Sequence, residues 1–188
     1  MTVTTLTEEH QQAREGCVYF PLEDFCLVEA KGKDTLSFLQ SQTTNDVLNL
    51  AIGSGLGNAL VDRKARLLGN FSLYKTSDSA ALLLLETQQR DTLINQLEEY
   101  HFREDLVWNR ETPFDYLLAL QGPKSPVILE NLTKSAVSLH NTNDIFTSNI
   151  DGVETWVICK SLTGEEGYIL ACSSDRFSPF HVSHHSTR

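Results

Sequence analysis

The chain is short of positive charge and of long apolar runs. Its 188 residues include 15 Lys and Arg against 25 Asp and Glu, which gives a formal net charge of -10. This balance excludes nucleic-acid binding by bulk charge, because phosphate neutralisation needs a basic surface, but it leaves open a small anion held by local donors. The longest apolar run, residues 80–85, is far shorter than the ~20 residues that cross a bilayer, so we expect no membrane segment.

Cysteine is equally scarce, and no targeting segment is recognisable. Residues 1–10 have neither the basic nor the apolar region of a secretory signal. The cysteines form no CxxC pair and are too few for a disulfide scaffold, which predicts a reducing, cytoplasmic location. They are Cys17, Cys26, Cys159 and Cys172.

The apolar content is sufficient for a folded domain. Hydrophobic residues make up 40% of the chain, and its length fits one ordinary domain or a large domain with part of a second. Helical and alternating patterns mix irregularly with hairpin signals, which predicts an α+β fold with a mixed sheet and packed helices. The expected strands are 25–30, 59–61, 67–74, 80–85, 106–108, 116–120, 145–150, 153–160 and 168–172, and helices are expected over 34–42, over 87–100 and from 123 or 124.

The two ends of the chain lack any clear period, and no internal repeat is recognisable. Residues 1–20 are expected to be a loose lead-in, and residues 173–188, rich in Ser and His, a disordered tail. A metal at His181, His184 and His185 is the alternative for the tail. No carboxylate or cysteine ligand is patterned with these histidines, so we expect no metal site.

Spacing alone assigns no catalytic residue. Gly53, Gly55 and Gly57 alternate, as in a phosphate-binding loop or in a strand that another backbone approaches closely; the lack of a P-loop pattern favours the strand. The turn at residues 163–167 carries two glutamates between glycines, which suits either the amino-pyrimidine edge of a heterocycle or a solvated turn. His101, at a helix end, is expected to complement the helix dipole rather than to act as a general base.

Five segments, in this order, resemble the folate-binding superfamily of the glycine cleavage T-protein. They are residues 22–32, 36–46 (with Gln42-Thr-Thr-Asn-Asp46), 62–74, 120–123 and 162–168 (with the Thr-Gly-Glu-Glu-Gly turn). The resemblance implies a partial aminomethyltransferase-like folate-binding region over residues 21–172.

Two branches of this superfamily differ at the strand expected over residues 67–74. Aminomethyltransferases carry paired aspartates there, the second of them catalytic, whereas this chain has Gly69 and Asn70. Asparagine can orient a ligand but cannot accept and return a proton near neutral pH. Leu162 and Ile169 also replace a tyrosine and a pterin-binding glutamate of the transferases. The departures resemble YgfZ-type folate-binding proteins, which implies a binding accessory of iron–sulfur enzymes and tRNA modification rather than an enzyme.

By the same resemblance, the ligand is a tetrahydrofolate species. An aromatic residue of the YgfZ type that is implicated in folate contact corresponds to Phe25, for which core packing is the alternative. Tyr74 matches an aromatic that faces the ligand. The expected cofactor-binding residues are Phe25, Asn45, Asn70, Tyr74 and Glu165.

The YgfZ type is also defined by a K-G-C-Y-x-G-Q-E segment well beyond the TGE turn, and this segment does not occur in the chain. The expectation is therefore a truncated, N-terminal portion of the family with a fold that is incomplete at its C-terminus. Two rivals stay open. One is an aminomethyltransferase that transfers a one-carbon unit to tetrahydrofolate, and the other is a fragment without function.

Overall fold

The computed structural model describes residues 6–137 and 141–176, which form four α-helices and ten strands. The helices are α1 (Leu6–Glu15), α2 (Thr35–Gln42), α3 (Arg90–Glu98) and α4 (Ser125–Thr133). The strands are β1 (Val18–Pro21), β2 (Phe25–Lys31), β3 (Gly55–Val61), β4 (Leu67–Ser77), β5 (Ala80–Glu86), β6 (Val107–Asn109), β7 (Tyr116–Gln121), β8 (Ile145–Ile150), β9 (Val153–Cys159) and β10 (Gly167–Cys172). None of the helices in these residues is long and apolar enough to cross a membrane.

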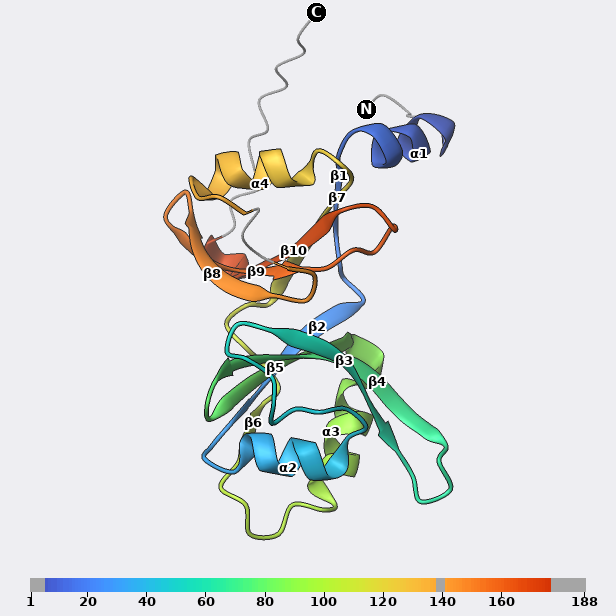
Figure 1. Cartoon of the computed structure of the whole chain (residues 1–188), viewed down its shortest axis with the longest axis vertical. Helices are drawn as coiled ribbons and strands as arrows, with labels where there is room; N and C mark the ends of the chain where they lie inside the picture. The colour runs from blue at the N-terminus through green and yellow to red at the C-terminus, as the bar shows by residue number, and fades with distance from the viewer. Residues whose placement is uncertain (1–5, 138–140, 177–188) are drawn as a thin grey trace, which may run out of the picture.

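The strands make two five-stranded sheets, one above the other (Figure 1). Sheet A has the order β1-β7-β10-β9-β8, and sheet B has the order β3-β4-β5-β2-β6. All pairings are antiparallel. The expected α+β class is therefore confirmed, and its β part consists of two antiparallel sheets in place of one mixed sheet.

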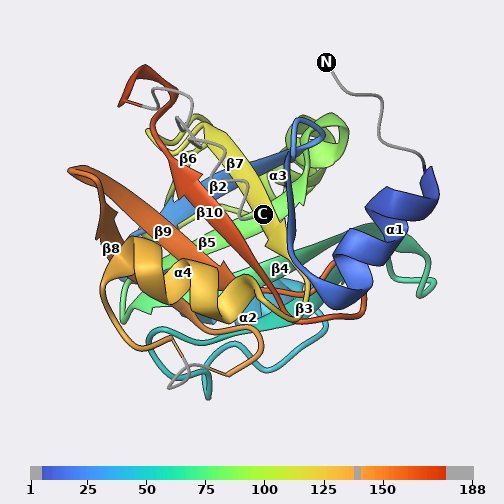
Figure 2. The ribbon, with the colours of Figure 1, turned by 90° about the horizontal axis from the view of Figure 1, so that it is seen from above.

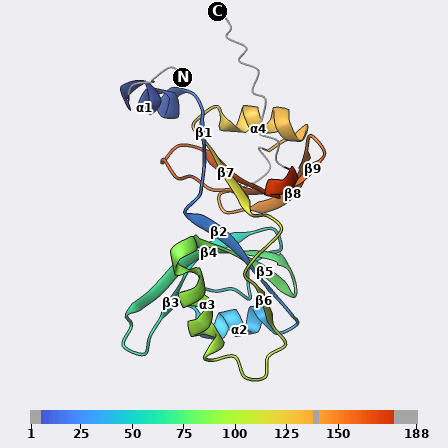
Figure 3. The same ribbon diagram turned by 180° about the vertical axis from the view of Figure 1, so that it is seen from behind.

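Three apolar layers hold the sheets and helices together. One lies between the sheets and includes Leu27 and Leu84 from sheet B and Ile158 and Ile169 from sheet A. The second packs the outer face of sheet B against α2 and α3, which lie beneath it in Figure 3. The third packs α4, through residues such as Leu129, on the outer face of sheet A, as the view from above shows (Figure 2). Burial on both faces explains why the strands are rich in leucine and isoleucine.

Most elements lie where the sequence patterns predict them. Asp151 (φ 50°) and Gly152 (φ 86°) both adopt the left-handed backbone of a type I′ turn, which connects β8 to β9 as expected. The helix expected to begin at Thr87 instead starts with a 3-10 turn, Thr87–Gln89, and becomes α3 at Arg90. No described side chain caps the first turn of α3.

The chain ends differ more from expectation. Residues 1–20 were expected to be a loose lead-in, but the described part of this segment contains α1 and most of β1, and β1 joins the edge of sheet A by pairing with β7. The sequence gives little sign of this strand because an edge strand needs only backbone partners, and Tyr19 within it is 61% exposed. At the other end, Ser174 donates two hydrogen bonds to Asp115, at 2.7 and 2.6 Å. The remainder of the predicted tail, with its three histidines, lies outside the described residues.

The two sheets are related by an internal structural repeat that the sequence analysis did not find. Each half runs helix, strand, strand, helix and three strands, from α1 to β5 and then from α3 to β10. The two halves repeat the same hydrogen bonds at equivalent positions. The hydroxyls of Thr43 and Thr133 each donate to the carbonyl of a leucine four residues earlier. The side chains of Gln40 and Glu130 each accept the backbone N–H of a valine seven residues later.

Equivalent positions of the two halves also meet each other. Ser54 and Asp144, each just before the edge strand of its sheet, form an isolated antiparallel bridge. The Ser54 hydroxyl donates to Asp144 Oδ1 at 3.0 Å, and the Ile145 N–H donates to the Gly53 carbonyl at 2.7 Å. Equivalent residues meet in this way where two halves are related by a local two-fold axis. The bridge joins the two sheets at the starts of β3 and β8.

Candidate functional site

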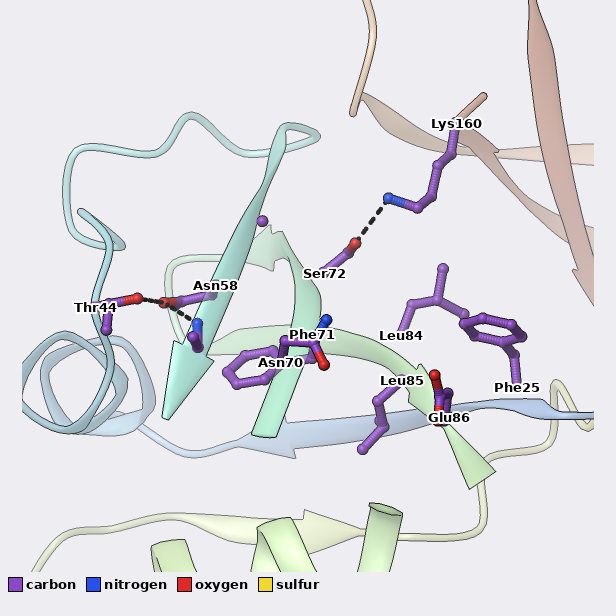
Figure 4. A pocket seen from close by; sticks show the side chains of 12 residues that line it. Phe25, Thr44, Asn58, Asn70, Phe71, Ser72, Leu84, Leu85, Glu86 and Lys160 are labelled. Atoms are coloured by element: carbon purple, nitrogen blue, oxygen red, sulfur yellow. Dashed lines mark hydrogen bonds between the residues drawn. The ribbon is translucent and has the colours of Figure 1, made fainter. Parts of the chain in front are cut away.

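A cavity of about 520 Å³ opens over the face of sheet B that looks toward sheet A (Figure 4). The floor of the cavity is the surface of sheet B, and the strand register explains which residues form it. Side chains alternate between the two faces along a strand, and directly opposed residues on neighbouring strands share a face. Ala59 lies opposite Asn70, and Gly57 lies opposite Ser72. On the other side of β4, Ser72 is followed across the sheet by Leu84. The small residues on β3 leave the room that Asn70 and Ser72 face.

The far side of the floor combines an aromatic ring with a carboxylate. Phe25 lies opposite Glu86 where β2 pairs with β5, and both side chains line the cavity. The Phe25 ring is half-buried and packs against the apolar layer between the sheets. Glu86 is exposed, and its Oε2 accepts a hydrogen bond from Gln89 Nε2 at 2.9 Å. A flat ring beside an acceptor is suited to an aromatic ligand with N–H donors.

The opposite wall contributes a lysine from sheet A. Lys160 follows β9, and its Nζ reaches across to donate a hydrogen bond to the Ser72 hydroxyl at 3.0 Å (Figure 4). Burial of the ammonium lowers the pKa of Lys160 from its usual value, because desolvation disfavours the charged form. Among the ion pairs formed by the described residues, none includes Lys160.

The segment after α2 supports the edge of the cavity. Asn58, which is 6% exposed, donates from Nδ2 to the Thr43 hydroxyl at 2.7 Å. Its Oδ1 accepts from the Thr44 hydroxyl at 3.3 Å and from the Asn45 N–H at 3.1 Å. Asn45 in turn donates from Nδ2 to the Gly57 carbonyl at 2.9 Å. This polar network joins the segment after α2 to β3 and pairs the polar groups between them.

The structure brings two of the five expected residues into the cavity. Phe25 and Asn70 line it, and the Asn70 side chain makes no hydrogen bond to another described residue, so its amide is available to a ligand. Asn45 does not line the cavity, but its side chain donates the hydrogen bond to the carbonyl of Gly57, which does.

Tyr74 and Glu165 lie elsewhere. Tyr74 is fully buried in the apolar layer between the sheets, and this burial raises its pKa to about 12. Tyr74 therefore packs in the apolar layer next to the cavity and does not line the cavity. Glu165 lines a separate cavity of about 300 Å³ at the turn before β10, and its Oε1 accepts a hydrogen bond from Arg14 at 2.6 Å.

Sequence reasoning named two of the residues that line the cavity and missed the others, among them Ser72, Glu86 and Lys160. Ser72 and Glu86 had a usable signal, since each is two residues from a neighbour on the same face, Asn70 and Leu84 respectively. Lys160 had none, because its place depends on how the two sheets face each other. For metal binding the described residues offer no group of three or more His, Cys, Asp or Glu side chains.

The arrangement can bind and orient a ligand, and its ionisable groups are few. Within the described lining, Glu86 is the one carboxylate and Lys160 the one cation. Asn70 can donate and accept hydrogen bonds at the same time but cannot exchange a proton with a substrate. The cavity volume lies within the range of sites that bind small molecules.

Comparison with known proteins agrees with this architecture. Two relatives carry the name aminomethyltransferase: one from Bacillus subtilis (strain 168), 31% identical over 92% of this chain and 48% of its own length, and one from Thermus thermophilus, 28% identical over 94% and 50%. The chain thus spans about half the length of these relatives. The crystal structure of glycine cleavage system aminomethyltransferase T from Bartonella henselae matches 88% of the chain with a TM-score of 0.75 at 21% identity.

A more distant structure shares the fold. Heterotetrameric sarcosine oxidase from Corynebacterium sp. U-96 matches 85% of the chain with a TM-score of 0.54 and 16% identity. The family model described as the GCVT N-terminal domain matches residues 2–181, which is nearly the whole chain. The chain therefore belongs to the GCVT N-terminal domain family.

Proposed function

We propose that this chain is the tetrahydrofolate-binding domain of an aminomethyltransferase-type protein, and that the cavity over sheet B holds the folate. One observation carries the proposal: in a domain of this family, Phe25 and the free amide of Asn70 converge on one cavity that also contains Lys160 and Glu86. The ring offers a flat apolar contact, and the amide and the two charges offer directional ones.

The aminomethyltransferase branch is better supported than the YgfZ-type branch that the Asn70 departure suggested. The relatives of the chain are named aminomethyltransferases, and the similar T-protein shares the fold. The comparisons contain nothing on iron–sulfur enzymes or tRNA modification, so that role has no further support. Asn70 remains a departure that bears on proton transfer more than on binding.

Calorimetric titration with 5-formyl-tetrahydrofolate tests the binding. We expect saturable heat for the wild type and about tenfold weaker binding for Phe25→Ala, because a stacking and burial contact is lost. Phe102→Ala is the matched control, since Phe102 is 81% exposed and does not line the cavity. Absence of heat at high micromolar ligand, from protein shown to be folded by circular dichroism, would refute the proposal.

The transfer reaction is tested separately with aminomethyl-loaded lipoyl carrier protein and tetrahydrofolate. Because Asn70 cannot exchange a proton, we expect the wild type to turn over slowly and Asn70→Asp to raise the rate by about 100-fold. Glu86→Gln shows whether the carboxylate of the cavity takes part. Equal rates for the wild type and Asn70→Asp would show that position 70 moves no proton.

A further inference from the structure

Lys160 is a half-buried cation with no ion-pair partner among the described residues. Among these residues, its Nζ hydrogen-bonds to the neutral Ser72 hydroxyl at 3.0 Å. Taking an ammonium partly out of water is costly unless an anion or several acceptors compensate it. The position of Lys160 in the wall of a cavity leaves room for the compensating anion to come from a ligand.

The charges of the cavity are separated between its two walls. Lys160 enters from sheet A at the top of Figure 4, whereas Glu86 lies on sheet B beside Phe25, lower in the same view. A ligand carboxylate is attracted to the first and repelled by the second. N–H donors on a ligand ring have the opposite preference, because a carboxylate is an acceptor and an ammonium is a donor only.

Tetrahydrofolate has the same two kinds of group at its two ends. The amino-pyrimidine ring presents N–H donors, and the glutamate at the other end presents carboxylates. We propose that Lys160 binds a carboxylate of the glutamate moiety and thereby sets the direction of the ligand, with the amino-pyrimidine ring on the Glu86 side and the Phe25 ring between. This inference rests on the proposed function, since it concerns the same cavity and ligand.

Two ligands and two variants test the contact. The ligands are 5-formyl-tetrahydrofolate and 5-formyl-tetrahydropteroate, which lacks the glutamate. We expect Lys160→Met to weaken binding of the glutamate-bearing ligand about tenfold or more, as loss of a charge-assisted contact does, and to leave the pteroate within about twofold. Lys160→Arg keeps the charge and should restore most of the affinity.

The control is Lys134→Met, which removes a surface lysine that bonds to the Asn131 carbonyl and does not line the cavity. Thermal melts of each variant show that it is folded, and Lys160→Met retains the apolar stem of the side chain. If Lys160→Met weakens both ligands equally, the lysine acts by packing and the inference is overturned. Unchanged binding of both ligands overturns it too, while the proposed function survives. Failure of the wild type to bind either ligand overturns both proposals.

Discussion

Replacing Gly55 with alanine places a methyl group in space that Tyr74 occupies. A Cβ at this position would lie 2.6 Å from Tyr74 Cε1 and 2.8 Å from the Leu73 carbonyl oxygen. The ring cannot move aside, because Tyr74 is 0% exposed and packs in the layer between the sheets. The Leu73 oxygen belongs to the paired strand β4, so it cannot retreat without breaking the ladder. Gly57, two residues along the same strand, has nothing within 4 Å of its Cβ position.

These contacts give opposite expectations for the two substitutions. Overpacking of a filled core costs about 1–3 kcal/mol, and restriction of the unfolded chain returns about 0.5 kcal/mol, so Gly55→Ala should lose about 1.5 kcal/mol of stability. Gly57→Ala should gain the unfolded-state contribution, about 0.5 kcal/mol, with no packing cost. With a urea m-value of about 2 kcal/mol/M, the midpoint of Gly55→Ala should fall by about 0.75 M and that of Gly57→Ala should rise slightly.

Urea unfolding followed by tryptophan fluorescence and by circular dichroism measures both midpoints and checks that the two probes agree. A Gly55→Ala midpoint equal to that of the wild type would refute the packing argument at Tyr74. An equal fall in both variants would show that the strand, rather than the contact, resists the change. Because Gly57 lines the cavity, Gly57→Ala should also weaken folate binding without loss of stability, which separates the two glycines a second time.

Two further predictions concern polar contacts. Asn58→Ala should destabilise the fold by about 2 kcal/mol in the same urea assay, because the half-buried Thr43 hydroxyl and the Asn45 N–H lose their partner; an unchanged midpoint would show that water replaces the amide. The Glu104 carbonyl, 2.8 Å from Nε2, and the Glu98 carboxylate, 3.1 Å from Nδ1, raise the pKa of His101 above 6.5. A raised pKa stabilises the fold below about pH 6.5, and this contribution is lost as the pH rises through the pKa of the folded state. His101→Gln should therefore cost about 0.5 kcal/mol more at pH 5.5 than at pH 9, and a pH-independent cost would contradict this.

Local signals in the sequence were enough to place most strands and helices. The Asp151-Gly152 pair specifies its own turn, and the run at residues 80–85 is too apolar to lie anywhere but inside. The 3-10 start of α3 was not visible, because a capping residue is only one of the forces acting on a first turn. The pairing of β1 with β7 was not visible either, since contacts between distant segments depend on the packing of the whole molecule.

In the candidate site, too, some residues could be named from the sequence, whereas others depend on contacts between distant segments. The alternating glycines were expected to mark a strand that another backbone approaches closely, and this holds for Gly55, whose Cβ position lies near the Leu73 carbonyl and the Tyr74 ring. Gly57 has nothing within 4 Å and lines the cavity, and Gly53 precedes the strand. Phe25 and Asn70 could be named because the resemblance to the folate-binding superfamily assigns a role to these two positions. Lys160 could not, because it meets Ser72 only through the facing of two sheets, and no local pattern encodes that arrangement.

The chain path through sheet A has a consequence for how the molecule closes. All of sheet B lies in residues 25–109, between β1 and its partner β7. Pairing of β1 with β7 must therefore close a loop that contains the entire other sheet. The entropy of such closure grows with the length of flexible chain, and a folded sheet B shortens that length to a few connecting residues. The edge of sheet A thus depends on the integrity of sheet B through the covalent connection as well as through the apolar layer between them.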